Sequence, residues 1–470
     1  MWGGPGNEKL RPQANEPRNT AAVMKPLRQP VRTLVIAGNC KARGSASMRN
    51  GIIGLSFVLV LVVCCLTQIL FPKALANNSL PPPTGSFAVG KVALHLVDES
   101  RIEPLSPNHE PREMMVDVWY PAESSVAAHA AYLDVAAYER ALGSDGFRNQ
   151  FRDAADALNE GVQTHAVIGA PYAHLAGRSA VLVFSPGGGM IREVYSTQLE
   201  DLASHGYVVA AISHSYDACM IIFPDGRQIA YSAQRWPTPP SLEGEANLNQ
   251  LEWHAEDIRF VLDELTRLNV AGSSAPPFAG HLNLNEVGAF GHSFGGIAAA
   301  HACQIDKRFK ACLNEDGSVA KRPFYLDVRG WGMDQAFMFI LRDAATRRLS
   351  EEEVAKMKMT RQQIEGLVAR LDEYQETALR NTGRGSYRVR LRNDVTTHGD
   401  FSDLSLLAAH DPADAERKAR ILAVVRSYTL AFFDRYLRGM KAESLDEPGS
   451  SELIEAVQKY APVRIPCPPQ

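Results

Sequence analysis

The sequence GHSFG at 291–295 has the G-x-S-x-G pattern that presents a nucleophilic serine in a sharp turn. It follows a strand expected over 287–290 and precedes a helix expected over 294–302. In this strand-turn-helix setting the glycines relieve crowding, and the helix N-terminus favours negative charge beside the hydroxyl. We therefore predict that Ser293 is the nucleophile of an acyl-transfer reaction. A glycine-rich turn without chemistry is the alternative.

A serine hydroxyl at its ordinary pKa is a poor nucleophile, so it needs a base, and the base needs an orienting carboxylate. We predict that Asp316 is that acid, because it directly follows a strand expected over 309–313 and precedes Gly317. Glu315 is the competing acid. If the strand continues to residue 315, the side chains of Glu315 and Asp316 point to opposite faces, and only one can serve.

We predict that His398 is the base. It lies in the loop TTHGDF at 396–401, after a strand expected over 387–391 and before the last helix, expected over 415–437. An isolated histidine in such a loop is more often a surface or capping residue, and here the serine and the carboxylate favour a catalytic role. Other histidines are less well placed: His281 precedes the nucleophile strand, His292 lies inside the turn, His301 is on the following helix, and His410 lies further along the chain.

A second glycine-rich turn, PGGG at 186–189, directly follows a strand expected over 180–184. Glycines let main-chain N–H groups approach a ligand closely, so this turn is a natural donor of one half of an oxyanion hole. The N–H of Phe294 would supply the other half. A plain tight turn is the alternative.

The elements that position these residues alternate between strand and helix. Short, nearly continuous apolar runs separated by helices predict an α/β fold with a mostly parallel, doubly wound sheet. Further strands are expected over 87–97, 114–120, 208–212 and 337–341, and further helices up to Ala203, over 251–268 and over 415–437, where Gly439 ends the chain's last helix.

A helical insertion at about 347–381 interrupts this alternation just before His398. Ser350 and Glu353 have the spacing of a capping box, and one apolar stripe from Ile364 to Tyr374 lies on a long, highly charged helical segment that runs to about Arg380. The insertion is either a surface helix packed on the core or a lid on the substrate side.

Composition excludes several classes of protein. The 470 residues are 45% hydrophobic and 22% charged, as in ordinary globular chains. Residues 77–470 carry 39 basic and 51 acidic side chains, a net charge of −12, which argues against a nucleic-acid or anionic-membrane surface. No phosphate-binding loop, zinc-ligand spacing or internal repeat is visible. We expect one large domain over 87–440 and a C-terminal tail over 441–470, with no metal and no cofactor.

The N-terminal residues predict export. Residues 1–47 are basic and proline-rich, as expected for a disordered tail, and 52–70 form an almost unbroken apolar run of nearly membrane-spanning length. Residues 48–76 then form either a cleavable signal peptide, with 1–47 a mis-assigned start, or a signal anchor. A lipid anchor through Cys64 or Cys65 is disfavoured. A proline-rich linker follows at 77–86, so we expect a secreted, periplasmic or membrane-anchored catalytic domain outside the cytoplasm.

Four cysteines follow residue 77: Cys219, Cys303, Cys312 and Cys467. An even number in an oxidising compartment permits disulfides without requiring any. We expect buried free thiols.

Several segments together resemble the platelet-activating factor acetylhydrolase family (plasma type and intracellular isoform II) within the α/β-hydrolases. In chain order they are VWYPA (118–122), FSPGGG (184–189), DLASHGYVVAA (201–211), GHSFGG (291–296), RFKACLNED (308–316) and HGDFSD (398–403). The resemblance covers about residues 87–440. It implies Ser293 as nucleophile, Asp316 as acid, His398 as base, and the amides of Gly188 and Phe294 as oxyanion donors.

The resemblance also implies a calcium-independent esterase for short or oxidised acyl esters of phospholipids, with related bacterial enzymes acting on other esters, including polyesters. The chain departs from the family in two places. Pro186 stands where the family usually has histidine, and the helical insertion lengthens the interval from Asp316 to His398 to 82 residues. We therefore expect a serine carboxylic-ester hydrolase for short-acyl substrates. The alternatives are a polyesterase or general carboxylesterase, and a catalytically inactive hydrolase-fold binding module.

Overall fold

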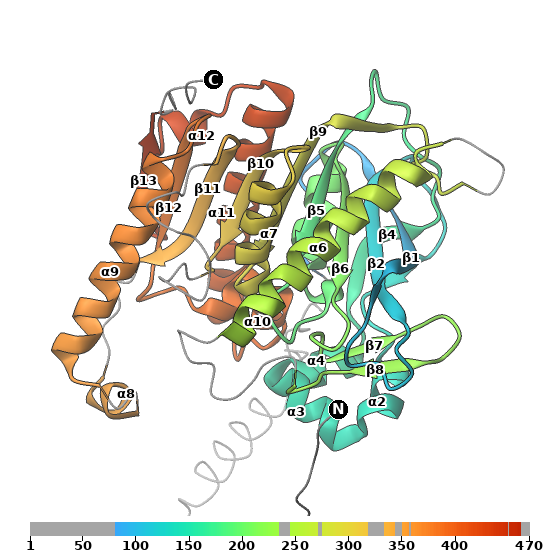
Figure 1. The fold of residues 1–470 in the computed structure, drawn as a ribbon, viewed down its shortest axis with the longest axis horizontal. Coiled ribbons are helices and arrows are strands. Elements are labelled where there is room, and N and C mark those ends of the chain that lie inside the picture. The colour runs from blue at the N-terminus through green and yellow to red at the C-terminus, as the bar shows by residue number, and fades with distance from the viewer. Residues whose placement is uncertain are drawn as a thin grey trace, which may run out of the picture. The chain divides into compact units, whose positions relative to one another are not determined.

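The computed structural model describes residues 80–234, 245–270, 275–317, 333–343, 350–356, 359–449 and 451–461. Its centre is an eleven-stranded sheet in the order β13-β12-β11-β10-β9-β5-β6-β2-β1-β4-β3 (Figure 1). The strands are β1 (Ala88–Ile102), β2 (Pro111–Ala122), β3 (His129–Ala131), β4 (Gln163–Ile168), β5 (Ser179–Ser185), β6 (Val208–Ser213), β9 (Leu282–His292), β10 (Phe309–Glu315), β11 (Ala336–Asp343), β12 (Ser386–Arg392) and β13 (Ile454–Tyr460). A separate hairpin pairs β7 (Met220–Ile222) with β8 (Gln228–Ala230).

Six neighbouring strands from β6 to β12 are parallel, and antiparallel strands flank them on both sides. In the middle of this group the side chains are mostly apolar and buried on both faces, as a parallel core requires: β5 and β6 are buried along their whole length. The predicted α/β class with a mostly parallel sheet is therefore confirmed. Because these strands run the same way, the residues that follow β5, β9 and β10 lie together at the carboxyl ends of the strands.

Helices cover both faces of the sheet. On one face α6 (Glu245–Leu268) and α7 (Phe294–Ile305) pack against side chains such as Val181 and Ala289. On the other, α5 (Ser196–Ser204) and α11 (Pro412–Arg438) pack against Leu182 and Phe290. Figure 1 shows α6 and α7 in front of the sheet and α11 behind it. Asp411 caps the start of α11, and Gly439, in the left-handed conformation, ends it as the sequence predicts.

Several elements were not expected from the sequence. They are β3, β4, the β7–β8 hairpin, β13, and the helices α2 (Val135–Leu142), α3 (Ser144–Phe151), α4 (Ala155–Glu160), α10 (Asp403–Leu407) and α12 (Glu443–Asp446). Most are short, and β13 lies in the segment that the sequence assigns to a tail. It nevertheless pairs antiparallel with β12 and closes one edge of the sheet.

The helical insertion is not one helix. It consists of α8 (Glu351–Lys356) and α9 (Arg361–Arg380). The break has a local cause, because Thr360 caps α9 in a capping box with Gln363 and so starts a new helix. At its C-terminal end α9 packs on the core through Ala378 and Leu379, which are buried.

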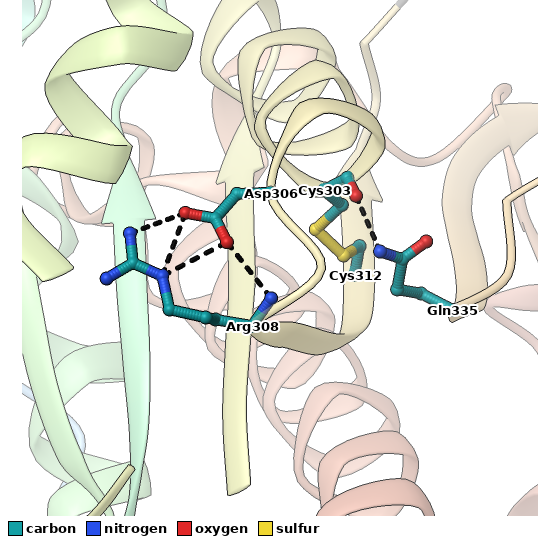
Figure 2. Close-up of a disulfide and its surroundings, with 5 residues drawn as sticks. All are labelled: Cys303, Asp306, Arg308, Cys312 and Gln335. Carbon is teal, nitrogen blue, oxygen red and sulfur yellow. Dashed lines mark hydrogen bonds and ion pairs between the residues drawn. A yellow bond between two sulfur atoms is a disulfide. The ribbon is translucent and has the colours of Figure 1, made fainter. Parts of the chain in front are cut away.

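The prediction of free thiols is wrong for two of the four cysteines. Cys303, near the end of α7, and Cys312, on β10, form a disulfide with a Cα–Cα distance of 6.5 Å (Figure 2). The tight connection from α7 to β10 brings the two residues within the range that a disulfide spans. Cys219 is a buried free thiol, as expected, and Cys467 lies outside the described residues.

Among the helices in the described ranges, none is both long and apolar enough to cross a membrane. The predicted tail, signal segment and most of the linker, residues 1–79, lie outside those ranges.

Candidate active site

Ser293 lies in the sharp turn between β9 and α7. Its main chain has φ 55° and ψ −123°, a conformation that side-chain-bearing residues rarely adopt. The turn is held in place because the Ser293 N–H donates a 2.7 Å hydrogen bond to the carbonyl oxygen of Glu315, at the end of the neighbouring strand β10. The strained turn presents the hydroxyl at the carboxyl ends of the parallel strands, where Ser293 is partly exposed.

His398 lies between Ser293 and Asp316. It opens a short 3-10 helix (His398–Phe401), and its Nε2 is 2.9 Å from Ser293 Oγ. Its Nδ1 is 2.5 Å from Asp316 Oδ2. The His398 side chain is 46% exposed and that of Asp316 is 7% exposed. Thus three side chains from separate segments form one hydrogen-bond chain that opens to solvent at the imidazole.

Arg342, on β11, also contacts Asp316. Its Nε donates to Asp316 Oδ2 at 2.6 Å, and its main-chain N–H donates to Oδ1 at 3.1 Å. Burial alone would raise the pKa of Asp316, but the hydrogen bond from His398 and the charge of Arg342 outweigh it, so the pKa lies below its usual value. Asp316 therefore stays ionised and can hold a protonated imidazole.

Glu315, the competing acid, points away from this chain. It is fully buried, and its Oε1 accepts hydrogen bonds from Gln198 at 2.5 Å and from Thr429 at 3.2 Å. Burial raises its pKa to about 8. The two acids thus lie on opposite sides of the strand end, and the structure places Asp316, not Glu315, beside His398.

The glycine-rich turn at 186–189, here called the oxyanion loop, lies against the nucleophile turn at 291–295. A Cβ added at Gly295 would collide with the main-chain oxygens of Ser185 and Pro186, so glycine is needed for β5 and the turn to approach this closely. Gly188 is exposed, and its amide has no hydrogen-bond partner within the described residues. Phe294 begins α7 directly after Ser293. The donor roles of Gly188 and Phe294 remain predictions.

The other histidines considered from the sequence contact different groups. His301 Nε2 is 3.0 Å from Glu252 Oε1, and the ring of His281 stacks on Tyr172. His292 lies behind the site, with Nδ1 2.9 Å from the Tyr195 hydroxyl. Within the described ranges, no group of three or more His, Cys, Asp or Glu side chains is arranged to hold a metal ion.

A second serine–histidine–aspartate chain lies nearby and was missed by the sequence analysis. Ser185 Oγ is 2.9 Å from His214 Nε2, and His214 Nδ1 is 2.8 Å from Asp257 Oδ2. Asp257 also accepts hydrogen bonds from Arg112 at 2.7 and 2.5 Å and from Arg101 at 2.8 Å. Burial alone would raise the pKa of Asp257, but Arg112 and the other donors hold it well below its usual value. All three members of this chain are buried.

One sequence signal for this chain exists. Ser185 ends β5 and His214 directly follows β6, so both stand at the carboxyl ends of adjacent parallel strands. Asp257 lies in the middle of α6, where nothing in the sequence distinguishes it from a surface carboxylate.

Comparison with known proteins adds independent information. The protein family described as "Platelet-activating factor acetylhydrolase, isoform II" matches residues 73–320. This range includes Ser293 and Asp316 but ends before His398. The chain is 28% identical over 277 residues to a "Probable 1-alkyl-2-acetylglycerophosphocholine esterase" of Arthroderma benhamiae, which covers 55% of this chain and 64% of that protein. It is also 28% identical over 149 residues to a "Platelet-activating factor acetylhydrolase" of Cavia porcellus, covering 29% and 34%. The alignments thus span less than two thirds of either relative.

Among solved structures, the chain is similar to a ferulic acid esterase from Streptomyces cinnamoneus. The TM-score is 0.59 and the sequence identity 29%, and the match covers 80% of this chain and 97% of that one. The match extends well beyond residue 320, the end of the family match.

Proposed function

Because this chain belongs to the platelet-activating factor acetylhydrolase isoform II family and has the α/β-hydrolase fold, as its motifs predict, we propose that it is a serine carboxylic-ester hydrolase. The observation that carries the proposal is the bridging position of His398, within hydrogen-bond distance of both Ser293 and Asp316. Nucleophile, base and acid in this order are what hydrolysis through an acyl-enzyme requires.

In the proposed reaction, Ser293 Oγ attacks the ester carbonyl carbon while His398 Nε2 takes the hydroxyl proton. Asp316 holds the imidazolium through Nδ1. The amides of Gly188 and Phe294 receive the developing oxyanion. His398 then returns the proton to the leaving alcohol. A water molecule, deprotonated by the same imidazole, attacks the acyl-enzyme and releases the acid.

The substrate we propose is an ester with a short acyl group, of the platelet-activating factor type. The printed name of the fungal relative, a 1-alkyl-2-acetylglycerophosphocholine esterase, supports this class. Polyester or general carboxylester hydrolysis is the alternative within the same chemistry. An inactive binding module is disfavoured, because Ser293, His398 and Asp316 are all retained in hydrogen-bonding positions.

A feruloyl or related aromatic ester is a second candidate substrate. It is favoured by the similarity to the ferulic acid esterase, which extends over nearly the whole of that protein. An aromatic acyl group and an acetyl group differ greatly in size, so the two candidates predict different acyl preferences.

Purified protein assayed on p-nitrophenyl esters from acetyl to palmitoyl, on an acetylated ether phospholipid and on methyl ferulate tests these proposals. We expect highest kcat/KM with short acyl groups and a loss of kcat of about 10⁴-fold or more in Ser293→Ala. A loss of less than about 100-fold in that variant would reject the mechanism, and a preference for palmitoyl or feruloyl esters would reject the short-acyl class.

We also propose that the catalytic domain acts outside the cytoplasm and that the apolar segment 52–70 engages the membrane at least during export. The Cys303–Cys312 disulfide supports this, because disulfides persist mainly in oxidising compartments. Cell fractionation with mass spectrometry of the N-terminus tests the proposal. Recovery of the protein in the cytoplasm with both thiols reduced would contradict it.

A further inference from the structure

Tyr195 connects the oxyanion loop to the nucleophile turn. It lies just before α5, and its side chain is buried. The Gly187 N–H donates to the Tyr195 hydroxyl at 3.1 Å, and the same hydroxyl is 2.9 Å from His292 Nδ1. The hydroxyl accepts from the amide and can still either donate to His292 Nδ1 or accept from it, so it holds both groups at once.

His292 is neutral at ordinary pH. Burial, with the charge of His398 as the next cause, lowers the pKa of His292 to about 3. A neutral imidazole either accepts or donates at Nδ1, according to its tautomer, and the Tyr195 hydroxyl can meet either. The His292 ring in turn packs against the His398 ring, at 4.6 Å between centroids, and stacks on Phe401 at 5.4 Å. The series of contacts from Gly187 through Tyr195 and His292 therefore ends at the ring of His398, the proposed base.

Gly187 is enclosed by these groups. A Cβ at Gly187 would lie 3.3 Å from His292 Nδ1, 3.3 Å from the Tyr195 hydroxyl and 3.4 Å from Ser293 Cβ. The Gly187 amide, held by Tyr195, cannot turn toward a substrate. The next peptide, which carries the Gly188 amide, is held between this anchored amide and the Met190 N–H, which donates to the Gly187 carbonyl oxygen at 2.9 Å.

We propose that Tyr195 is a positioning residue of the hydrolytic site, whose hydroxyl ties the oxyanion loop to His292 and sets the Gly188 amide relative to Ser293. The inference rests on the proposed function. An oxyanion donor acts when charge develops on the carbonyl oxygen, so its misplacement weakens transition-state stabilisation more than substrate binding. A misplaced donor therefore lowers kcat and leaves KM nearly unchanged.

Tyr195→Phe tests the proposal, because it removes one oxygen and keeps the ring packed against Phe184. We expect kcat to fall about 10- to 100-fold with KM changed less than twofold, since losing a donor outright costs about 10² to 10³ in rate. Affinity for a trifluoromethyl ketone, which forms the tetrahedral oxyanion with Ser293, falls by a similar factor.

Tyr120→Phe is the matched control. Tyr120 is also buried, and its hydroxyl donates a single hydrogen bond, at 2.8 Å, to the carbonyl of Ala170. Tyr120 lies near the C-terminal end of β2, where it pairs with Gly90 of β1. The carboxyl end of β6 lies beside the other end of β2, at Met115. We expect this variant to lose stability much as Tyr195→Phe does, with kcat within twofold of wild type. Equal kcat losses in the two variants would overturn the proposal.

Hydrogen exchange separates failure of the inference from failure of the proposed function. In Tyr195→Phe the amide of Gly187 loses its acceptor, so the peptide covering 184–190 should exchange faster than in wild type and in Tyr120→Phe. Unchanged exchange refutes the positioning role even in an active enzyme. A wild-type protein that hydrolyses no ester refutes the proposed function, whatever the exchange result.

Discussion

The molecule contains two serine–histidine–aspartate chains that differ in exposure. In Ser293–His398–Asp316 the histidine lies 2.9 Å from the serine and 2.5 Å from the carboxylate. In Ser185–His214–Asp257 the corresponding distances are 2.9 and 2.8 Å. The first histidine side chain is 46% exposed, and the second is 2% exposed.

The order of the hydrogen bonds alone therefore does not make a catalytic site. Ser185 ends a regular strand and is buried, whereas Ser293 occupies a strained turn at the sheet edge. Asp257 is neutralised by two arginines, and Asp316 by one. We infer that the exposed chain is built to transfer protons and that the buried one is built to hold β5, β6 and α6 together.

Replacing each serine by alanine separates the two chains most strongly. Ser293→Ala should lower kcat by about 10⁴-fold or more, because it removes the nucleophile. Ser185→Ala should keep activity within tenfold of wild type but cost about 1 to 3 kcal/mol of unfolding free energy, since buried His214 loses its partner. Steady-state kinetics and urea denaturation measure the two effects. A comparable rate loss in both variants would show that the buried chain also takes part in the reaction.

The two carboxylates should differ in the same way as the two serines: loss of Asp316 should mainly lower the rate, and loss of Asp257 should mainly lower the stability. Asp316→Asn should lower kcat about 10⁴-fold, as expected when the base loses its orienting anion. Asp257→Asn should cost about 3 to 5 kcal/mol of unfolding free energy, because it leaves the guanidinium of Arg112 buried without its full counter-charge. Both variants are compared by kinetics at permissive temperature and by denaturant unfolding. An Asp257→Asn variant as stable as wild type would contradict the structural role of Asp257.

Glu315 is a buried acid that directly precedes Asp316 of the exposed Ser293–His398–Asp316 triad. Its folded-state pKa of about 8 lies above the ordinary value of 4.5. Between these two pH values the folded protein keeps a proton that the unfolded chain releases. Its contribution to stability therefore falls as pH rises, by roughly 1.4 kcal/mol per pH unit at most. Glu315→Gln should flatten this decline and keep activity within twofold. Urea denaturation from pH 5 to 9 measures it, and an unchanged slope would contradict the raised pKa.

The smallest expected effect concerns Arg342, the single arginine on the exposed chain. Arg342→Gln removes the guanidinium that donates to Asp316 Oδ2 and helps to keep the pKa of that carboxyl below its usual value. The carboxylate then orients His398 less firmly, so kcat should fall about two- to fivefold. Arg342→Lys is the control that keeps the charge and should retain more of the rate. Steady-state kinetics measure the difference, and wild-type kcat in Arg342→Gln would contradict the assigned role.

The sequence predicts the parts of this site that follow from local pattern and chain order. The turn around Ser293 has a motif, and Asp316 and His398 stand after strands where the fold brings loops together. The second chain, and the contact of Tyr195 with Gly187, depend on which helix face meets which strand end, and pattern alone does not specify that. The disulfide was missed because its formation depends on the tight connection between α7 and β10.

Two residues of the Ser293–His398–Asp316 triad have strained backbone conformations, which bears on why they are retained. Ser293 and Asp316 both have positive φ, 55° and 52°, at the ends of adjacent strands. Such conformations cost about 1 to 3 kcal/mol each for residues with a side chain, and glycine would relieve much of that cost. At position 293, glycine would relieve this cost and remove the nucleophile, so only selection on turnover, and not selection on folding, accounts for a serine there. At position 316, glycine would also remove the acceptor of two hydrogen bonds from Arg342, so the carboxylate contributes to the fold as well.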